Sequence, residues 1–225
     1  MIRFFDILFS GVAIIIFLPF MIPIMIALKL TGEHYIFYFQ PRVGKGGREF
    51  NIMKFATMLK DSPNLAGGVL TQKNDPRILP MGKFLRKTKI NELPQLINIF
   101  IGQMSVIGPR PQAKQHYDLY SDDVKKSIDS IPPGLSGIGS IVFRDEENIL
   151  DAVQGDRDHF HDTVIASYKG DLEVWYSQNR KLCNYFLLIF LTVWVIIKPS
   201  SNIYTRFLKT LPEVPLKLKE HLFYA

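Results

Sequence analysis

The sequence predicts a mainly helical α+β protein in which an apolar amino-terminal segment precedes a small polar domain. Residues 7–28 are almost wholly apolar and are interrupted by Pro19 and Pro23, and residues 182–197 form a second apolar run. Between these runs, short strand-like stretches alternate with helical ones. We therefore expect three parts: a proline-broken membrane helix at 1–30, a domain with interfacial helices at 31–198, and a basic amphipathic tail at 199–225.

The composition limits the class of partner. The chain has 225 residues, of which 47% are hydrophobic, so it can bury one substantial core. Its 27 Lys and Arg outnumber its 21 Asp and Glu, giving a net charge of +6, which suits anionic headgroups, phosphorylated substrates or nucleic acid. The basic residues are dispersed between apolar runs and form no recognisable nucleic-acid motif, so we expect no nucleic-acid partner.

The first apolar run is long enough to cross a bilayer. Its 22 residues make a helix of about 33 Å, and no small-residue cleavage site follows. Pro19 and Pro23 each remove a helical hydrogen bond, which predicts a kink that lets the segment enter and leave on one face. Basic residues on both sides, Arg3 before it and Lys29 after it, favour keeping both ends cytoplasmic. A kinked spanning helix remains the alternative.

The second apolar run, 182–197, makes about 24 Å of helix, which is short for a span. It is equally compatible with a core helix and with a helix at the membrane interface. The side chains expected on one face are Phe186, Leu187, Phe190, Leu191, Trp194 and Ile197. Cys183, the only cysteine, lies in this run and is expected to be a buried structural thiol. The basic tail that follows is expected to lie on the bilayer surface or to be partly disordered.

For the first half of the domain, the sequence predicts two strands and two helices. Residues 35–39 and 49–53 are expected to be strands joined by the turn Gly44–Gly47. The turn either only connects the strands or also binds a phosphate through its backbone N–H groups. Residues 61–74 are expected to be an exposed loop. Residues 83–89 should form a basic helix, and 92–101 an amphipathic one.

The second of these helices places a polar pair at its start. Pro94 suits the first turn, Asn91 is a natural N-cap, and Glu92 lies near the positive end of the helix dipole. Glu92 is the only acid between Lys83 and Ile107 and has basic neighbours. We expect it to be an indispensable carboxylate, as a metal ligand or as a nucleophile.

Arg110 is the strongest candidate for a phosphate ligand. The prolines on both sides in Gly108-Pro109-Arg110-Pro111 fix the backbone, which lowers the entropic cost of aiming the guanidinium at a phosphate. A rigid surface turn with a solvated arginine is the alternative. Lesser candidates for the same anionic pocket are Arg42, Lys54, Arg77 and Arg86.

Two later segments have weaker signals. The bend 132–140 leads to the charged run Arg144-Asp145-Glu146-Glu147. We expect this segment either to bind a sugar or a base or to be a solvated loop. His159 and His161 with their flanking aspartates resemble a metal-ligand cluster. They lack a third patterned ligand, so we expect a solvated loop there.

Several motifs in order resemble the bacterial sugar transferase family, the monotopic phosphoglycosyl transferases that act on polyprenyl phosphate. The resemblance covers residues 3–198. Its marks are the proline-broken apolar segment, Gln40-x-Arg42-x-Gly44, Phe50 with Lys54-Phe55-x-Thr57-Met58, Asp75-x-Arg77, Glu92-Leu93-Pro94-Gln95-Leu96, and Met104-Ser105-x-x-Gly108-Pro109-Arg110-Pro111.

The resemblance implies an enzyme at the cytoplasmic face of the bacterial inner membrane. It implies transfer of sugar-1-phosphate from a UDP-sugar to undecaprenyl phosphate, release of UMP, Mg²⁺, and a re-entrant first helix. The product would start an O-antigen, capsule, exopolysaccharide or glycoprotein glycan. Inner-membrane lipids are implied partners, and a homodimer stays open. The expected catalytic residues are Glu92, also the metal ligand, and Asn91. The expected substrate ligands are Arg110, Arg42, Lys54, Arg77, Arg86, Gln95 and Arg144.

The chain departs from the family pattern at Asn91, Gln103, Ala56 and Leu18. Family members use an adjacent aspartate and glutamate, and the aspartate takes the phosphosugar covalently. Asn91 stands at the aspartate position, and an amide cannot be that nucleophile. Three interpretations follow: Glu92 takes over, transfer occurs directly to the lipid phosphate, or the position is silenced. The alternative functions are therefore a silent membrane scaffold and a glycosyltransferase that releases UDP.

Overall fold

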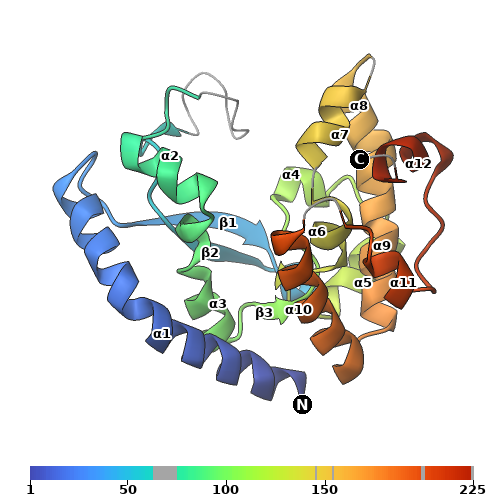
Figure 1. Ribbon diagram of the computed structural model, residues 1–225, viewed down its shortest axis with the longest axis horizontal. Helices are drawn as coiled ribbons and strands as arrows, with labels where there is room; N and C mark the ends of the chain where they lie inside the picture. Colours follow the sequence, from blue (N-terminus) through green and yellow to red (C-terminus); the bar gives the residue numbers. More distant parts are fainter. Residues whose placement is uncertain (63–74, 145, 154, 199–200, 224–225) are drawn as a thin grey trace. The chain divides into compact units, whose positions relative to one another are not determined.

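The structure, a computed structural model, describes residues 1–62, 75–144, 146–153, 155–198 and 201–223. It confirms a mainly helical α+β fold (Figure 1). Most of the loop expected at 61–74 lies outside the described residues, as does Asp145.

The longer helices are α1 (Ile2–Leu30), α2 (Pro80–Lys87), α5 (Asp122–Asp129), α9 (Ala166–Gln178), α10 (Leu182–Ile197) and α12 (Leu216–Phe223). The shorter ones are α3 (Gln95–Ile101), α4 (Lys114–Tyr117), α6 (Ile138–Val142), α7 (Glu146–Ala152), α8 (Arg157–Phe160) and α11 (Tyr204–Phe207). Tight 3₁₀ turns occupy η1 (Lys45–Gly47) and η3 (Ile90–Glu92), and η4 (His161–Ile165) is a wider π-helical turn. The strands are β1 (Phe37–Val43), β2 (Glu49–Phe55), β3 (Ser105–Ile107) and β4 (Gly134–Ser136). β1 pairs with β2, and β3 pairs in parallel with β4.

The chain divides into two compact units. The first comprises residues 1–6, 42–50 and 102–225, and the second comprises 7–41 and 51–101. The predicted strands and helices are confirmed with shifted ends: the first strand begins two residues later than expected, and the helix expected from Glu92 begins at Gln95.

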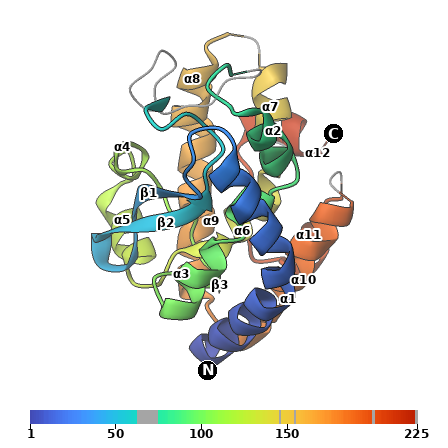
Figure 2. The ribbon, with the colours of Figure 1, turned by 90° about the vertical axis from the view of Figure 1, so that its left-hand side faces the viewer.

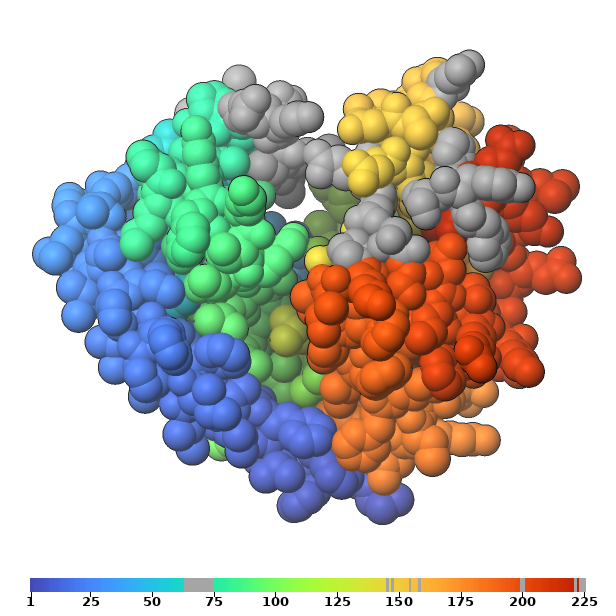
Figure 3. Space-filling model, viewed as in Figure 1, coloured from blue at the N-terminus to red at the C-terminus, as the bar shows by residue number. Residues whose placement is uncertain are grey.

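Helix α1 passes through both prolines without interruption, so the break expected at Pro19 and Pro23 does not occur, although the helix bends along its length (Figure 2). Among the described residues it is the one helix long and apolar enough to cross a membrane. Only 11% of its most apolar window is buried, and the helix lies uncovered in the space-filling view (Figure 3). A long apolar helix left exposed in this way fits membrane association.

One face of the carboxyl-terminal half of α1 is packed within the second unit. Met21 and Leu28 pack with Phe55 of β2 and Leu85 of α2 in one core. Gly82 lets α2 approach the end of β2, because a Cβ there would lie 2.1 Å from the Thr57 carbonyl oxygen. This close contact fixes the chain just before the turn that holds Glu92.

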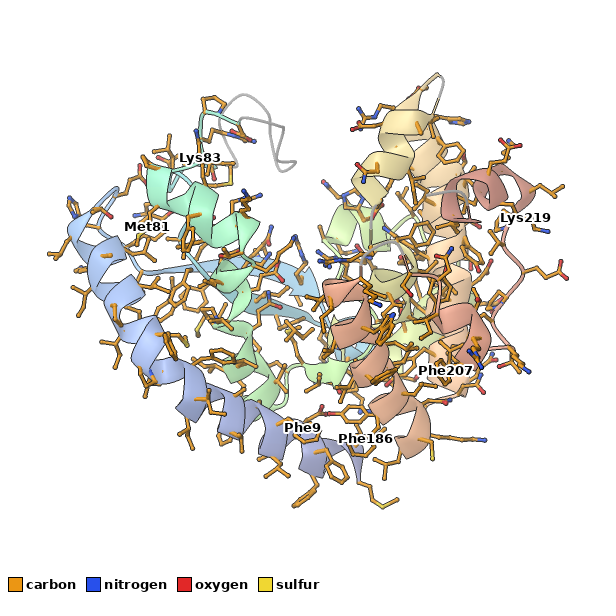
Figure 4. All side chains as sticks on the ribbon, in the orientation of Figure 1. Phe9, Met81, Lys83, Phe186, Phe207 and Lys219 are labelled. Atoms are coloured by element: carbon orange, nitrogen blue, oxygen red, sulfur yellow. The ribbon has the colours of Figure 1, made fainter. Side chains whose placement is uncertain are left out.

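The first unit is built around α9, which packs against α5 and α6. Its fully buried side chains include Tyr168, Leu172 and Tyr176. α10 is a core helix on one side and leaves an apolar face exposed on the other: Tyr185, Leu188, Leu191 and Val195 are buried, whereas Phe186, Phe190, Val193, Ile196 and Ile197 are exposed. Figure 4 labels Phe186, whose ring meets that of Phe5 at 4.9 Å between centroids.

Two expectations for this unit are wrong. Cys183 is exposed rather than buried, because it lies on the outer side of the first turn of α10. The segment around His159 and His161 is helical rather than a loop, since α8 and η4 run directly into α9. The tail also packs on its unit in part, with Tyr204, Leu208, Leu218 and Leu222 buried.

Candidate functional site

Asn91 and Glu92 lie on the 3₁₀ turn η3, between α2 and α3. Lys89 precedes this turn in the left-handed conformation, with φ of 60°. Asn91 is only 6% exposed, and its Oδ1 atom accepts no hydrogen bond from any described residue. The expectation that Asn91 caps the following helix is therefore wrong, since α3 begins at Gln95 and the amide oxygen stays without a donor. A buried acceptor without a partner is costly, and such atoms often mark ligand positions.

The carboxylate of Glu92 shares this region with the guanidinium of Arg86. Glu92 is half-buried, and Arg86 lies in the last turn of α2. Burial lowers the pKa of Arg86, while the nearby Asp75 and Glu92 carboxylates raise it. Arginine keeps its charge under such shifts, so Arg86 stays a cation near Glu92.

Arg77 has a structural role that its motif did not reveal. Its guanidinium donates from Nη2 to Oδ2 of Asp75 at 2.6 Å and from Nε to Oδ1 at 2.9 Å. Its Nη1 donates to the Ser62 carbonyl at 2.7 Å, and the side chain is 4% exposed. A bidentate, buried pair of this kind holds the guanidinium in place, so we do not carry Arg77 forward as a phosphate ligand.

Lys54 and Gln95 complete the predicted residues of the second unit. Lys54 is half-buried on β2, and Gln95 is buried as the first residue of α3. Residues 51–101 thus supply the acid, the amide and two of the predicted cations, Arg86 and Lys54.

The first unit holds Arg110 on a rigid loop, as its prolines predict. The Gly108 N–H donates to the Ser136 carbonyl at 2.9 Å, and the Gly134 N–H donates to the Pro109 carbonyl at 2.8 Å. A Cβ at Gly108 would lie 2.5 Å from the Pro132 carbonyl oxygen, so this close approach requires glycine. The Arg110 side chain is exposed, and the residue lines a pocket with Gly44, Gln112 and Tyr117.

Arg42 and Arg144 belong to the same unit as Arg110. Arg42 is half-buried on β1, and Arg144 is exposed just after α6. The predicted site residues thus fall into two groups, one with Glu92 and one with Arg110.

The comparisons with known proteins identify the family of the chain. The sequence model of bacterial sugar transferases matches residues 1–199. The chain belongs to the bacterial sugar transferase family.

Two of the relatives that the chain matches are named as undecaprenyl-phosphate sugar phosphotransferases. The chain is 33% identical over 197 residues to a UDP-N-acetylgalactosamine-undecaprenyl-phosphate N-acetylgalactosaminephosphotransferase of Aeromonas hydrophila, covering 87% of this chain and 43% of that protein. It is 32% identical to an undecaprenyl-phosphate galactose phosphotransferase of Salmonella typhimurium, covering 87% of this chain and 40% of that protein. It is 33% identical to the exopolysaccharide production protein ExoY of Rhizobium meliloti, covering 73% of this chain and 81% of that protein.

The chain spans about two fifths of the length of several relatives, including an uncharacterized sugar transferase of Haemophilus influenzae at 40%. The shared part is the one that holds both groups of site residues.

Glu173 is a buried acid that the sequence analysis missed. It lies on α9, is 5% exposed, and accepts from the Arg110 backbone N–H at 3.5 Å. Burial raises the pKa of Glu173 to about 8, and its Oε2 has no partner within the described part of the chain. Gly139 leaves room for it, since a Cβ there would lie 2.8 Å from Oε1. An acid within the apolar stretch from Leu172 to Tyr176 was the available signal.

A second missed group links α7 to η4 and α9. Lys169 donates to both oxygens of Glu146, at 2.6 and 2.7 Å, and His161 Nε2 lies 3.4 Å from Glu146 Oε1. The pKa of Glu146 falls to about 2, because hydrogen bonds and charge from His161 and Lys169 outweigh the burial that raises it. The sequence singled out Glu146 and His161 in separate motifs but did not pair them.

Asp6 is the third missed residue. It is 2% exposed although it lies in the first turns of an apolar helix. Its carboxylate accepts from Ser105 Oγ, the Val106 N–H and Tyr185 Oη, each at 2.9 Å. The amino end of α1 is therefore tied to β3 and α10 of the first unit.

Proposed function

We propose that this protein transfers sugar-1-phosphate from a UDP-sugar to undecaprenyl phosphate and releases UMP. The proposed place is the cytoplasmic face of the bacterial inner membrane, where the product starts a glycan. The observation that carries the proposal is a buried Asn91 oxygen that accepts no hydrogen bond from the described residues, on the same turn as Glu92, in a member of this family.

The same two residues fit the Mg²⁺ that the family resemblance implies. Mg²⁺ binds oxygen ligands, usually one or two from the protein together with substrate phosphates. The Glu92 carboxylate and the Asn91 Oδ1, which lacks a donor within the described ranges, are such ligands. The ion supplies charge neutralisation at the diphosphate when it is bound.

The chemistry breaks one phosphoanhydride bond. An oxygen nucleophile attacks the phosphorus that carries the sugar, and the bond from this phosphorus to the bridging oxygen breaks, so that UMP leaves. Arg86 and Arg110 offer guanidinium groups that bind the phosphate oxygens. The product is undecaprenyl diphosphate sugar.

Two oxygen nucleophiles are compatible with this reaction, the Glu92 carboxylate and the lipid phosphate. If Glu92 attacks, an acyl phosphate forms, and a lipid phosphate oxygen then attacks the same phosphorus and releases the carboxylate. If the lipid phosphate attacks directly, Glu92 acts as a ligand and no covalent intermediate forms. Asn91 serves neither as base nor as nucleophile, because its side chain is an amide.

A re-entrant α1 is part of the proposal, and Asp6 supports it. The amino end of the helix is bonded to Ser105 and Tyr185 of the first unit, and its other half packs with Phe55 and Leu85 of the second. A helix that crosses the bilayer must separate Asp6 from these donors and carry it through the apolar phase. Both ends of α1 therefore belong on the side of the polar domain.

The direct test is product analysis. The full chain, in nanodiscs containing undecaprenyl phosphate and Mg²⁺, is incubated with a panel of UDP-sugars, and the nucleotide released is identified. We expect UMP for at least one donor. Release of UDP instead indicates a glycosyltransferase and contradicts the proposal.

Asn91 favours a second function, a membrane scaffold that binds its ligands without turnover. An amide where family members have the aspartate nucleophile is the observation behind it. This function predicts binding of UDP-sugar with no UMP release, and activity that appears on Asn91→Asp.

A further inference from the structure

We propose that the cluster of Glu146, His161 and Lys169 binds the sugar of the donor. This inference rests on the proposed function, since it takes the donor to be a UDP-sugar, and it adds the part of the molecule that selects the sugar.

The cluster combines side chains from three helical elements. Glu146 begins α7, His161 begins η4, and Lys169 lies on α9. Lys169 Nζ contacts both oxygens of Glu146 at 2.6 and 2.7 Å, and His161 Nδ1 lies 2.8 Å from Asp162 Oδ1. The His116 ring stands edge-on to the His161 ring, with 6.2 Å between centroids. Donors and acceptors thus alternate over a short distance, which is the arrangement that vicinal hydroxyl groups require.

The side chains are held in place yet still reach solvent. Lys169 is 16% exposed, and Glu146 and His161 are each 28% exposed. The surface pair Lys114–Asp118 of the same unit is 60% and 50% exposed, as expected of a solvated ion pair. The cluster is therefore preorganised without being closed off, which is the condition for a polar binding site.

The predicted phosphate ligands of this unit, Arg110 and Arg42, lie within electrostatic range of the cluster. The charge of Arg110 acts on Lys169, and the charge of Arg42 acts on His116. A sugar-1-phosphate carries its sugar next to the phosphate, so a group within electrostatic range of these arginines is placed to meet it.

The charge of the cluster argues for a neutral ligand. Glu146 and Asp162 are acids, and Lys169 and His161 face them as bases, so that opposite charges offset one another; the hydrogen bond to Glu146 raises the pKa of His161, whereas burial lowers the pKa of His116. Carboxylates repel phosphate oxygens, so the cluster is not a second phosphate site. A sugar bears hydroxyl groups that donate to Glu146 and accept from Lys169.

The test measures sugar selectivity in the full chain. Values of kcat/KM are determined by UMP release for UDP-glucose, UDP-galactose and UDP-N-acetylgalactosamine, in the wild type, Glu146→Gln and Lys169→Met. Lys114→Met is the matched control, because it removes a lysine from an exposed ion pair of the same unit. We expect the ratio between the best and the next donor to change about tenfold in the cluster variants, because one charge-assisted hydrogen bond to the sugar is lost. The KM for undecaprenyl phosphate and the ratio in Lys114→Met should stay unchanged.

Two results overturn the proposal. If all donors lose the same factor while Tm falls, the cluster only supports the fold. If the inhibition constant of UMP weakens as much as binding of the UDP-sugar, the cluster recognises the nucleotide. Glu146→Asp keeps the carboxylate and should retain part of the selectivity, and it decides the question if Lys169→Met does not fold.

Failure of the proposed function has a different signature. If the wild type releases no UMP, equilibrium binding of each UDP-sugar is compared with that of UDP. If the wild type binds a UDP-sugar more tightly than UDP and Glu146→Gln loses this difference, the sugar site is still supported. Equal affinities of the wild type for the UDP-sugar and for UDP refute it.

Discussion

Asn91 and Glu92 are neighbours whose environments set different roles. Asn91 is buried with an oxygen that no described residue satisfies, and Glu92 is half-buried with the Arg86 cation nearby. Replacement of one carboxylate oxygen in Glu92 by an NH₂ group changes charge and metal affinity but hardly changes volume.

We predict that Glu92→Gln abolishes turnover without unfolding the protein. The amide can neither attack phosphorus nor hold Mg²⁺ as an anion, so UMP release should fall at least about 10³-fold. Circular dichroism and Tm should match the wild type. An active Glu92→Gln protein with normal UMP release contradicts both roles given to Glu92.

Asn91→Asp tests the position at which family members have their nucleophile. We expect activity to be preserved or raised, since a second carboxylate beside Glu92 supplies an anion where the amide now stands. Labelled donor followed by acid quench and peptide mapping locates any phosphosugar adduct. An adduct outside Asn91 and Glu92 in this variant refutes the site.

Arg110 is predicted to bind phosphate through both arms of its guanidinium. Arg110→Lys keeps the charge and loses the planar fork, so kcat/KM should fall by about tenfold to a hundredfold. Arg48→Lys, an exposed arginine of the same unit, is the control and should have no effect. Near-normal turnover of Arg110→Lys reduces Arg110 to a turn residue.

At the scale of elements, α1 shows that two prolines in a row of apolar residues do not have to end a helix. The helix bends and continues, and its fixed point is Asp6, with three donors around one carboxylate. We expect the prolines and this anchor to act together on the membrane topology of α1.

We predict that loss of the anchor releases the amino end of α1. Asp6→Asn keeps the size but weakens the three hydrogen bonds, which should cost about 1–3 kcal/mol. Combined with Pro19→Ala and Pro23→Ala, it should convert the helix to a full span, whereas the proline changes alone should do so only in part.

Cysteine labelling measures this topology. Arg3→Cys is introduced in a Cys183→Ser background, because Cys183 is exposed and would react as well. A membrane-impermeant maleimide should reach position 3 only from the cytoplasmic side in the protein with Asp6. Labelling from the periplasmic side in that protein contradicts the re-entrant proposal.

For the whole molecule, the buried Glu173 sets a pH dependence of stability. The pKa of Glu173 is raised from 4.5 to about 8 by burial, so the folded state binds a proton that the unfolded state has released. Folding stability is then highest below the unfolded pKa and falls as pH rises through about 8.

We expect the Tm of the wild type to fall more than the Tm of Glu173→Gln as the pH is raised from 6 to 8.5. His161, whose pKa is raised mainly by its hydrogen bond to Glu146, titrates with the same sign, so only the difference between the two proteins isolates Glu173. Glu146 has the opposite sign, because its pKa of about 2 stabilises the fold above 4.5, and it does not titrate in this window. Parallel curves for the two proteins contradict the raised pKa.

The sequence by itself determined the apolar first helix, the apolar α10, the strands on both sides of Gly44–Gly47 and the rigid loop at Arg110. These depend on local properties: runs of apolar side chains, helical spacing, glycine turns and prolines fix the backbone over a few residues. The family also followed from local motifs, because their order along the chain is specific.

Only the tertiary structure decided which polar groups meet. Asp6 finds Ser105 and Tyr185, Glu173 finds the Arg110 backbone, and Glu146 finds Lys169, over separations from 23 to 179 residues. It also paired Arg77 with Asp75 and left the Asn91 oxygen without a donor among the residues that the structure describes. The cost of burying a charge or a polar atom is set by whatever side chains packing brings to it, and packing is a property of the whole chain that no local pattern records.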